Sequence, residues 1–260
     1  MLCNREIKFG PFKEHAQKLG ADFIATGHYC GVRTEENGLT YLYRAKDENK
    51  DQTYFLNQVR MEQLENVLFP LTELTKPEVR DIAHKYNLAT AEKKDSTGIC
   101  FIGERNFRAF LNQYLPMKEG DIKTLDGKTV GRHNGVFFYT IGQRKGFGLG
   151  GAENGNGLPY YVIKKDVVNN ILYVNQGECD ELFRTELRTE PFHCITRPLT
   201  DGMKVQTRLR HRQPLADATV ELMKDGGIIL HFDTPMRAVT PGQYAVVYDG
   251  RDCLGGGVII

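Results

Sequence analysis

The hydrophobic pattern of this 260-residue chain changes near residue 107, and this change constrains the fold more than any other feature. Before it, apolar residues at helical spacing alternate with short apolar runs that are typical of buried strands. After it, short alternating runs are separated by glycine-rich turns, which is typical of β structure. The pattern therefore predicts an α/β region at residues 1–107, a small β-rich region at residues 108–174, and a small barrel or sandwich at residues 175–260.

The α/β part contains one segment where a ligand site is expected. An apolar run over residues 23–26 predicts a buried strand that ends at Gly27 and His28. Ligands of α/β folds bind beyond the carboxyl ends of strands, so both residues are candidates for a site. Helices are predicted before and after this strand, over residues 9–19, 52–58 and 61–68 and after the capping box Thr75–Glu78, where Val79, Ile82, Ala83 and Tyr86 form the expected buried stripe.

Composition narrows the class of protein. Hydrophobic residues make up 40% of the chain and the formal net charge is +1, whereas a dedicated non-specific nucleic-acid binder is usually more basic. No apolar run approaches the length of a membrane helix, and the N-terminus lacks a secretory signal pattern, so we expect a cytoplasmic protein with no membrane partner. The six cysteines include no C-x-x-C pair, which argues against a structural zinc site.

One strand pattern in the last third is unusually basic. If residues 204–212 form a strand, Lys204, Arg208, Arg210 and Arg212 share one face with Gln206, and the other face is apolar. Such a face fits a track for a phosphate backbone. The same pattern also fits a solvated edge strand that discourages aggregation.

Six stretches, in this order and spacing, resemble the bacterial tRNA-specific 2-thiouridylase family across essentially the whole chain. They are residues 2–9 (LCNREIKF), 25–29 (ATGHY), 49–55 (NKDQTYF), 94–105 (KDSTGICFIGER), 140–146 (TIGQRKG) and 253–257 (CLGGG). The resemblance implies a nucleotide-binding α/β domain of the PP-loop type, followed by a central domain and a β-barrel. Family members also carry a Ser-Gly-Gly-Val-Asp-Ser loop around the ATP phosphates, which this sequence does not contain. We therefore expect the α/β domain to be partial and this polypeptide alone to bind ATP weakly.

The resemblance implies the chemistry as well. The family transfers persulfide sulfur to C2 of the wobble uridine of tRNA through an adenylated uridine, with ATP and Mg²⁺. It implies Cys100 as the residue that receives the sulfur from a donor protein, and Cys3 as the nucleophile that finally forms a disulfide with Cys100. Arg5 and Lys8 near Cys3, and Lys93 and Lys94 near Cys100, favour reactive thiolates.

The resemblance also implies binding residues. Gly27 would contact ATP, and the residues implied to contact the anticodon arm of tRNA are His28, Lys50, Asp51, Gln52, Arg210, His211, Arg212 and Gln243. Gln143, Arg144 and Lys145 fit either a tRNA contact or a structural turn flanked by glycines. The other cysteines, at positions 30, 179, 194 and 253, are expected to be inert, and we expect a monomer.

Three other functions remain open at this point. A thiol redox protein that uses Cys3 and Cys100 as a switch would form the disulfide without any dependence on tRNA or nucleotide. A non-catalytic RNA-binding protein would bind tRNA through the C-terminal half without thiolation. A sulfurtransferase that acts on another substrate of PP-loop enzymes is a more distant third possibility.

Overall fold

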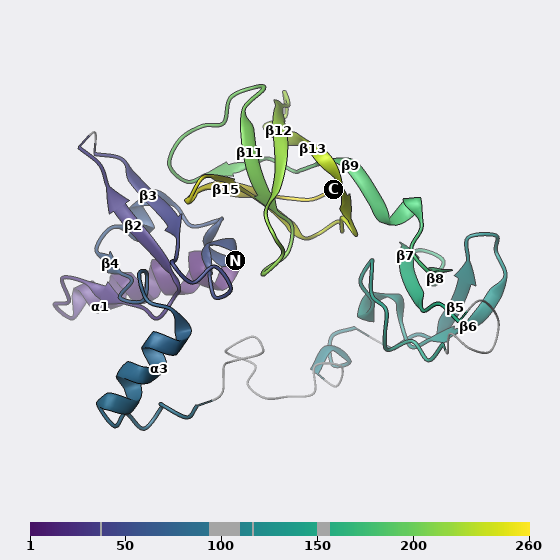
Figure 1. Ribbon diagram of the computed structural model, residues 1–260, viewed down its shortest axis with the longest axis horizontal. Coiled ribbons are helices and arrows are strands. Elements are labelled where there is room, and N and C mark those ends of the chain that lie inside the picture. Colours follow the sequence, from purple (N-terminus) through teal and green to yellow (C-terminus); the bar gives the residue numbers. More distant parts are fainter. Residues whose placement is uncertain (37, 94–109, 116, 150–156) are drawn as a thin grey trace. The chain divides into compact units, whose positions relative to one another are not determined.

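The computed structural model describes residues 1–36, 38–93, 110–115, 117–149 and 157–260, which fall into two compact units (Figure 1). The first unit comprises Met1–Lys93, Thr185–Thr234 and Pro241–Ile260, and the second comprises Lys94–Arg184 and Pro235–Thr240. The N-terminal part of the chain therefore shares one folding unit with the C-terminal part.

The N-terminal part has the expected α/β arrangement. Strand β1 (Ile24–Ala25) pairs in parallel with β4 (Val67–Leu68) and ends just before Gly27, as the apolar run predicts. The helical elements of this part are η1 (Asn4–Phe12), α1 (Lys13–Lys18), η2 (Thr53–Leu56), α2 (Met61–Leu64) and α3 (Lys76–Lys85). A parallel strand pair separated by crossover segments is the wiring of an α/β fold.

Several helix predictions need correction. The helix expected over 52–58 is the short 3-10 helix η2, and the one expected over 61–68 ends at Leu64 and continues into β4. The capping box of α3 forms, with the Thr75 hydroxyl accepting from Glu78 N and the Glu78 carboxylate accepting from Thr75 N. The apolar stripe of α3 is not buried, because no described segment covers it.

Nine strands among the described residues form one sheet that continues from the N-terminal part into the barrel. Its order is β2-β3-β15-β14-β11-β12-β13-β9, and β10 pairs with β15. The strands are β2 (Cys30–Thr34), β3 (Thr40–Arg44), β9 (Phe183–Arg188), β10 (His193–Cys194), β11 (Lys204–Arg208), β12 (Ala216–Leu222), β13 (Ile228–Arg237), β14 (Tyr244–Asp249) and β15 (Asp252–Val258). The hairpin of β2 and β3 joins the barrel where Tyr43 pairs with Asp252.

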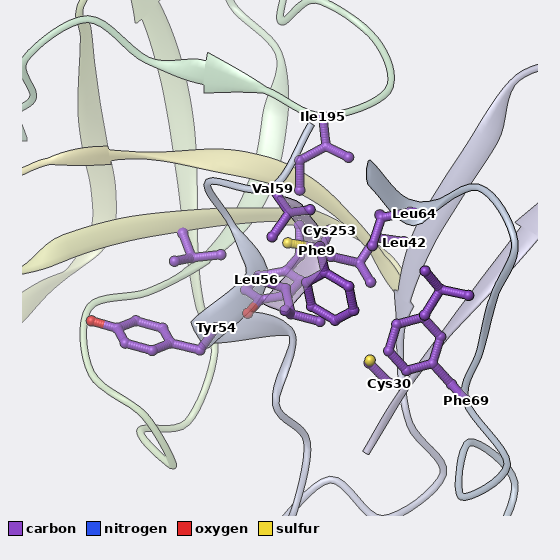
Figure 2. Close-up of a cluster of buried hydrophobic side chains, with 13 residues drawn as sticks. Phe9, Cys30, Leu42, Tyr54, Leu56, Val59, Leu64, Phe69, Ile195 and Cys253 are labelled. Carbon is purple, nitrogen blue, oxygen red and sulfur yellow. The ribbon is translucent and has the colours of Figure 1, made fainter. Parts of the chain in front are cut away.

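One hydrophobic core serves both parts of this unit. Figure 2 shows Phe9, Leu42, Leu56 and Val59 from the N-terminal part packed together with Ile195 and Cys253 from the barrel. Val246 and Tyr248 of β14 belong to the same buried cluster. The segment that carries the NKDQTYF motif therefore packs directly on the barrel.

The second unit is a small β domain with its own core. Its sheet has the order β6-β5-β8-β7, where β5 and β8 run parallel and the other pairs are antiparallel. Its elements are β5 (Gly120–Thr124), β6 (Thr129–His133), η3 (Val136–Phe138), β7 (Tyr160–Asp166), β8 (Ile171–Gln176) and η4 (Asp180–Leu182). The segment of η3 follows Gly135, which has a φ of 130° that favours glycine.

Candidate functional site

The residues implied to contact tRNA come from four separated segments, and the motif over residues 49–55 connects these segments within the first unit. Gln52 is anchored to the strand-end loop, since its backbone N donates to Tyr29 O (2.8 Å) and its side-chain Oε1 accepts from Tyr29 N (3.0 Å). Lys50 sits in a turn in which its backbone N donates to Asp47. These contacts place Lys50 and Gln52 next to the loop that carries Gly27 and His28.

Asp51 is fully buried, so the direct tRNA contact that the resemblance implies does not fit the structure. Its Oδ2 accepts from the Thr53 hydroxyl (2.7 Å) and from Arg208 Nη1 (3.2 Å), and its Oδ1 accepts from the backbone N of Ala45 and of Thr53. Burial raises the pKa of Asp51, while the Thr53 hydrogen bond and the Arg208 charge oppose that rise. Asp51 thus ties the motif to the barrel from the inside.

Arg208 accordingly changes the interpretation of the basic strand. Strand β11 ends at Arg208, whose side chain is buried against Asp51, and residues 209–212 form a turn. The expected row of four cations along one strand face therefore does not exist. Arg210, His211 and Arg212 instead lie together on the turn that follows β11, with Arg212 at a φ of 65°.

Tyr54 joins this turn to the segment that carries Gln243. Its hydroxyl is 3.0 Å from Leu209 O and 3.3 Å from Tyr244 O, so one phenol lies within hydrogen-bond distance of both segments. Burial raises the pKa of Tyr54 to about 12, which keeps the hydroxyl protonated as a donor. Gln243 is exposed in the turn before β14, directly beside Tyr244.

His211 and Phe55 form an aromatic pair next to these residues. Their ring centroids are 4.6 Å apart and the rings are tilted by 45°. Burial lowers the pKa of His211, and the positive charges of Arg212, Arg208 and Lys50 lower it further. The imidazole is therefore neutral at pH 7, and the cations that act on its pKa come from both the motif and the barrel.

Cys3 lies at the N-terminal end of η1 and is partly exposed. The next residue, Asn4, donates from its side-chain amide to Phe55 O (3.0 Å), and Gln63 donates to Arg5 O (2.7 Å). The helix that carries Cys3 is thus fixed to the same motif that carries Lys50, Gln52 and Phe55. Cys100 and the rest of its motif, residues 94–105, lie outside the described residues, as do the contacts that would pair it with Cys3.

Gly27 and His28 differ in how well they fit a ligand site. Gly27 is exposed just beyond β1, and a Cβ placed there would meet Leu71 Cδ1 at 3.9 Å, so a ligand can approach its backbone closely. His28 is 9% exposed; its Nδ1 lies 2.7 Å from the Thr26 hydroxyl and its ring packs near Phe9. Burial, and then the charge of Lys8, lowers the pKa of His28 to about 4. The packing role that the sequence also allowed for His28 is the one the contacts support.

The remaining cysteines fit an inert role to different degrees. Cys30 and Cys253 lie in the buried core, and burial raises the pKa of each thiol well above its ordinary value. Cys179 and Cys194 are partly exposed.

In the second unit, Gln143 is part of a local turn, where its side chain accepts a hydrogen bond from Thr140 N and donates one to Lys145 O.

The sequence did not identify Arg208, Tyr54 and Phe55 as the residues that connect the separate segments of this site. All three lie in the stretches 49–55 and 204–212, beside residues that the sequence had already marked as candidates. That neighbourhood was the signal that could have identified them. Among the described residues, no helix is long and apolar enough to span a membrane.

Comparison with known proteins agrees with this arrangement. Three family descriptions match consecutive parts of the chain: the tRNA methyl transferase HUP domain at residues 1–104, the tRNA methyl transferase PRC-barrel domain at 108–176 and the aminomethyltransferase beta-barrel domain at 184–259. The chain is 50% identical to the tRNA-specific 2-thiouridylases MnmA of Streptococcus thermophilus (strain CNRZ 1066) and Streptococcus sanguinis (strain SK36). It is 49% identical to that of Streptococcus mutans serotype c.

Each of these alignments covers 100% of this chain and 70% of the relative. Identity of this level over the whole chain extends through the α/β part, the central domain and the barrel alike. The resemblance found in the short motifs is thus confirmed over the full sequence. The chain belongs to the tRNA-specific 2-thiouridylase family of sulfurtransferases.

Proposed function

We propose that this protein transfers sulfur to C2 of the wobble uridine of tRNA. The observation that carries the proposal is the gathering of Lys50 and Gln52, the turn at 210–212 and Gln243 around the buried Tyr54 and the aromatic pair of Phe55 and His211. These segments are far apart in the sequence, and the helix that begins at Cys3 is fixed to the same motif.

The chemistry of this surface suits an anticodon arm. Lys50, Arg210 and Arg212 bring cations for phosphates, and Gln243 brings an exposed amide that can recognise a base edge. His211 and Phe55 bring a neutral aromatic pair, and unpaired RNA bases commonly stack on such rings. A wobble base must leave its stack to reach a reacting thiol, so cations, amide and rings close to the helix of Cys3 form a coherent site.

Two thiols account for the sulfur transfer. A donor protein leaves a sulfane sulfur on Cys100 as a persulfide, and the Cys3 thiolate attacks the Cys100 sulfur. This step forms the Cys3–Cys100 disulfide and releases hydrosulfide, which replaces the C2 oxygen of the uridine. An external dithiol then reduces the disulfide by thiol exchange and returns both thiols to the starting state.

ATP, with Mg²⁺, supplies the adenylyl group that makes the C2 oxygen a good leaving group. Gly27 is the described residue that fits the nucleotide, because it is exposed at the end of β1 and offers its backbone to a close approach. We also propose domain limits at 1–107, 108–174 and 175–260, a cytoplasmic location and a monomeric state.

The test is the 2-thiouridine content of cellular tRNA after the gene is changed in its own organism. Cys3→Ser and Cys100→Ser are each expected to abolish 2-thiouridine, measured by mass spectrometry of digested tRNA. Cys179→Ser, at another partly exposed thiol, is the matched control and is expected to leave it unchanged. Unchanged 2-thiouridine in both test variants would reject the two-thiol chemistry, and loss of a methylated nucleoside instead would indicate methyl transfer.

A further inference from the structure

We propose that the buried ion pair of Asp51 and Arg208 is a positioning element, which holds the two cationic segments of the tRNA surface at a fixed separation. One segment is the turn of Lys50 and Gln52, and the other is the turn of Arg210–Arg212. This inference rests on the proposed function, because it concerns how that surface is organised. Neither residue of the pair touches RNA itself.

The first support is the completeness of the contacts around Asp51. The carboxylate is 0% exposed and accepts from two backbone N–H groups, one hydroxyl and one guanidinium, at Ala45, Thr53 and Arg208. A carboxylate that is held by four donors has little freedom to rotate. The backbone of the motif is therefore fixed in direction on both sides of Asp51.

The second support is the enclosure of Arg208. The residue is 4% exposed, its Nη1 lies 3.2 Å from Asp51 Oδ2, and its guanidinium carbon lies 5.8 Å from the ring centre of Tyr248. The Tyr248 hydroxyl is in turn 3.2 Å from the Thr53 hydroxyl. The guanidinium is thus held between the motif and a barrel strand.

The third support is the position of the pair in the chain. Lys50 directly precedes Asp51, and β11 ends at Arg208 just before the turn that carries Arg210 and Arg212. A tie between residues 51 and 208 therefore sets the separation of two cationic turns that are more than 150 residues apart in sequence (|i−j| = 157). Phosphates of a folded RNA are spaced rigidly, so this separation decides whether both turns are engaged together.

Stability alone is a weak reason for such a pair. Desolvation of two charges offsets much of their attraction, and replacing a buried ion pair with uncharged groups of similar shape is often neutral. Removing only one partner leaves an unpaired buried charge and destabilises the fold. A positioning role and a stabilising role can therefore be separated by removing both charges together.

The deciding variant is the double change Asp51→Asn with Arg208→Met. Asparagine keeps an acceptor for the two backbone N–H groups, methionine keeps an apolar stem, and no unpaired charge remains. We expect a melting temperature close to that of the unchanged protein, but binding of a tRNA transcript weaker by about tenfold, which is about 1.4 kcal/mol. Arg208→Lys, which keeps the charge but not the fork-shaped donor, is expected to give an intermediate loss.

Salt dependence distinguishes positioning from direct contact. A residue that touches a phosphate contributes to the slope of log Kd against log salt, and its removal lowers that slope by about 1. We expect Lys50→Ala and Arg212→Ala to lower the slope, and the double variant to keep the unchanged protein's slope. A lowered slope in the double variant would show that Arg208 contacts phosphate, which would overturn the inference.

The matched control is Asp225→Asn, which removes one partner of the exposed ion pair with Arg188 on the same barrel. Its tRNA affinity is expected to stay unchanged. If Lys50→Ala and Arg212→Ala bind tRNA as tightly as the unchanged protein, the proposed tRNA surface itself is wrong. If those two weaken binding and the stable double variant does not, only the positioning role is rejected.

Discussion

His28 shows how one buried side chain makes the stability of this protein depend on pH. Its pKa is lowered from 6.5 to about 4, first by burial and then by Lys8, so the folded state keeps the imidazole neutral in mildly acidic solution. The unfolded chain binds a proton below 6.5, and the folded chain does so only near 4. His28 therefore contributes stability that is complete above pH 6.5 and is lost as the pH falls towards 4.

The first prediction follows from this shift. Between about pH 7.5 and about pH 5, the free energy of unfolding should fall by about 2 kcal/mol through His28 alone. Urea denaturation at both pH values measures the fall. His28→Asn keeps an acceptor for the Thr26 hydroxyl but cannot titrate, so its loss of stability over the same range should be smaller by that amount. An equal loss in both proteins would refute the assignment to His28.

A second prediction at the residue scale concerns Tyr54, whose hydroxyl lies between Leu209 O and Tyr244 O. Tyr54→Phe removes the single O–H that lies within reach of both carbonyls and should cost about 1 to 2 kcal/mol of unfolding free energy. The same change should weaken tRNA binding several-fold, because the segments of Arg210 and Gln243 lose their common partner.

Tyr86→Phe is the control for the Tyr54 change, since Tyr86 is 66% exposed and loses only a solvated hydroxyl. It should change stability by less than about 0.5 kcal/mol. Urea titrations and a filter-binding assay with a tRNA transcript provide both measurements. If Tyr54→Phe has the same stability and tRNA affinity as Tyr86→Phe, the contacts of the Tyr54 hydroxyl with Leu209 O and Tyr244 O have no energetic importance.

At the scale of elements, local sequence signals predicted where helices and strands begin and end better than they predicted which faces of those elements are buried. The end of β1 before Gly27 and the capping box of α3 depend on neighbouring residues, and both appear as expected. The outward face of β11 depends on what covers it, and alternation alone could not show that Arg208 meets Asp51 from a distant segment. The same limitation explains the uncovered stripe of α3.

Strand β15 gives the clearest constraint on a single element. A Cβ on Gly256 would lie 2.3 Å from Asn57 Oδ1 and 3.1 Å from Ala245 O, because the motif segment packs tightly on this strand. Gln58 also donates to Gly256 O at 2.7 Å, which holds the two backbones close together. Gly256 of the CLGGG stretch thus serves close packing against the N-terminal part.

We predict that Gly256→Ala lowers the free energy of unfolding by about 2 kcal/mol or more, since the side chain and backbone around it must shift. Gly27→Ala is the comparison, because a Cβ there meets only ordinary contact at 3.9 Å. It should change stability by less than about 0.5 kcal/mol. Chemical denaturation of the two variants checks the difference, and equal stabilities would show that β15 adapts to a methyl group.

At the scale of the whole molecule, the order of domains along the chain does not show which of them share a hydrophobic core. The change of pattern near residue 107 distinguishes α/β from β segments, but it cannot show that residues 1–93 share a core with the barrel. That association depends on long-range contacts such as Tyr54 to Leu209 and Gln58 to Gly256. No local pattern encodes such pairs.

Because the N-terminal part and the barrel share one core, we expect them to unfold as one cooperative unit, separately from the central domain, which has its own core. Leu56 and Leu172 are both fully buried, one in each core, and truncation of either should cost about 2 to 5 kcal/mol. Leu56→Ala should therefore speed amide hydrogen exchange in both η2 and β14, and leave β8 unaffected. Leu172→Ala should do the reverse. If Leu56→Ala accelerates exchange in η2 but not in β14, the two parts unfold separately, and the surface proposed to bind tRNA is not held together by a common core.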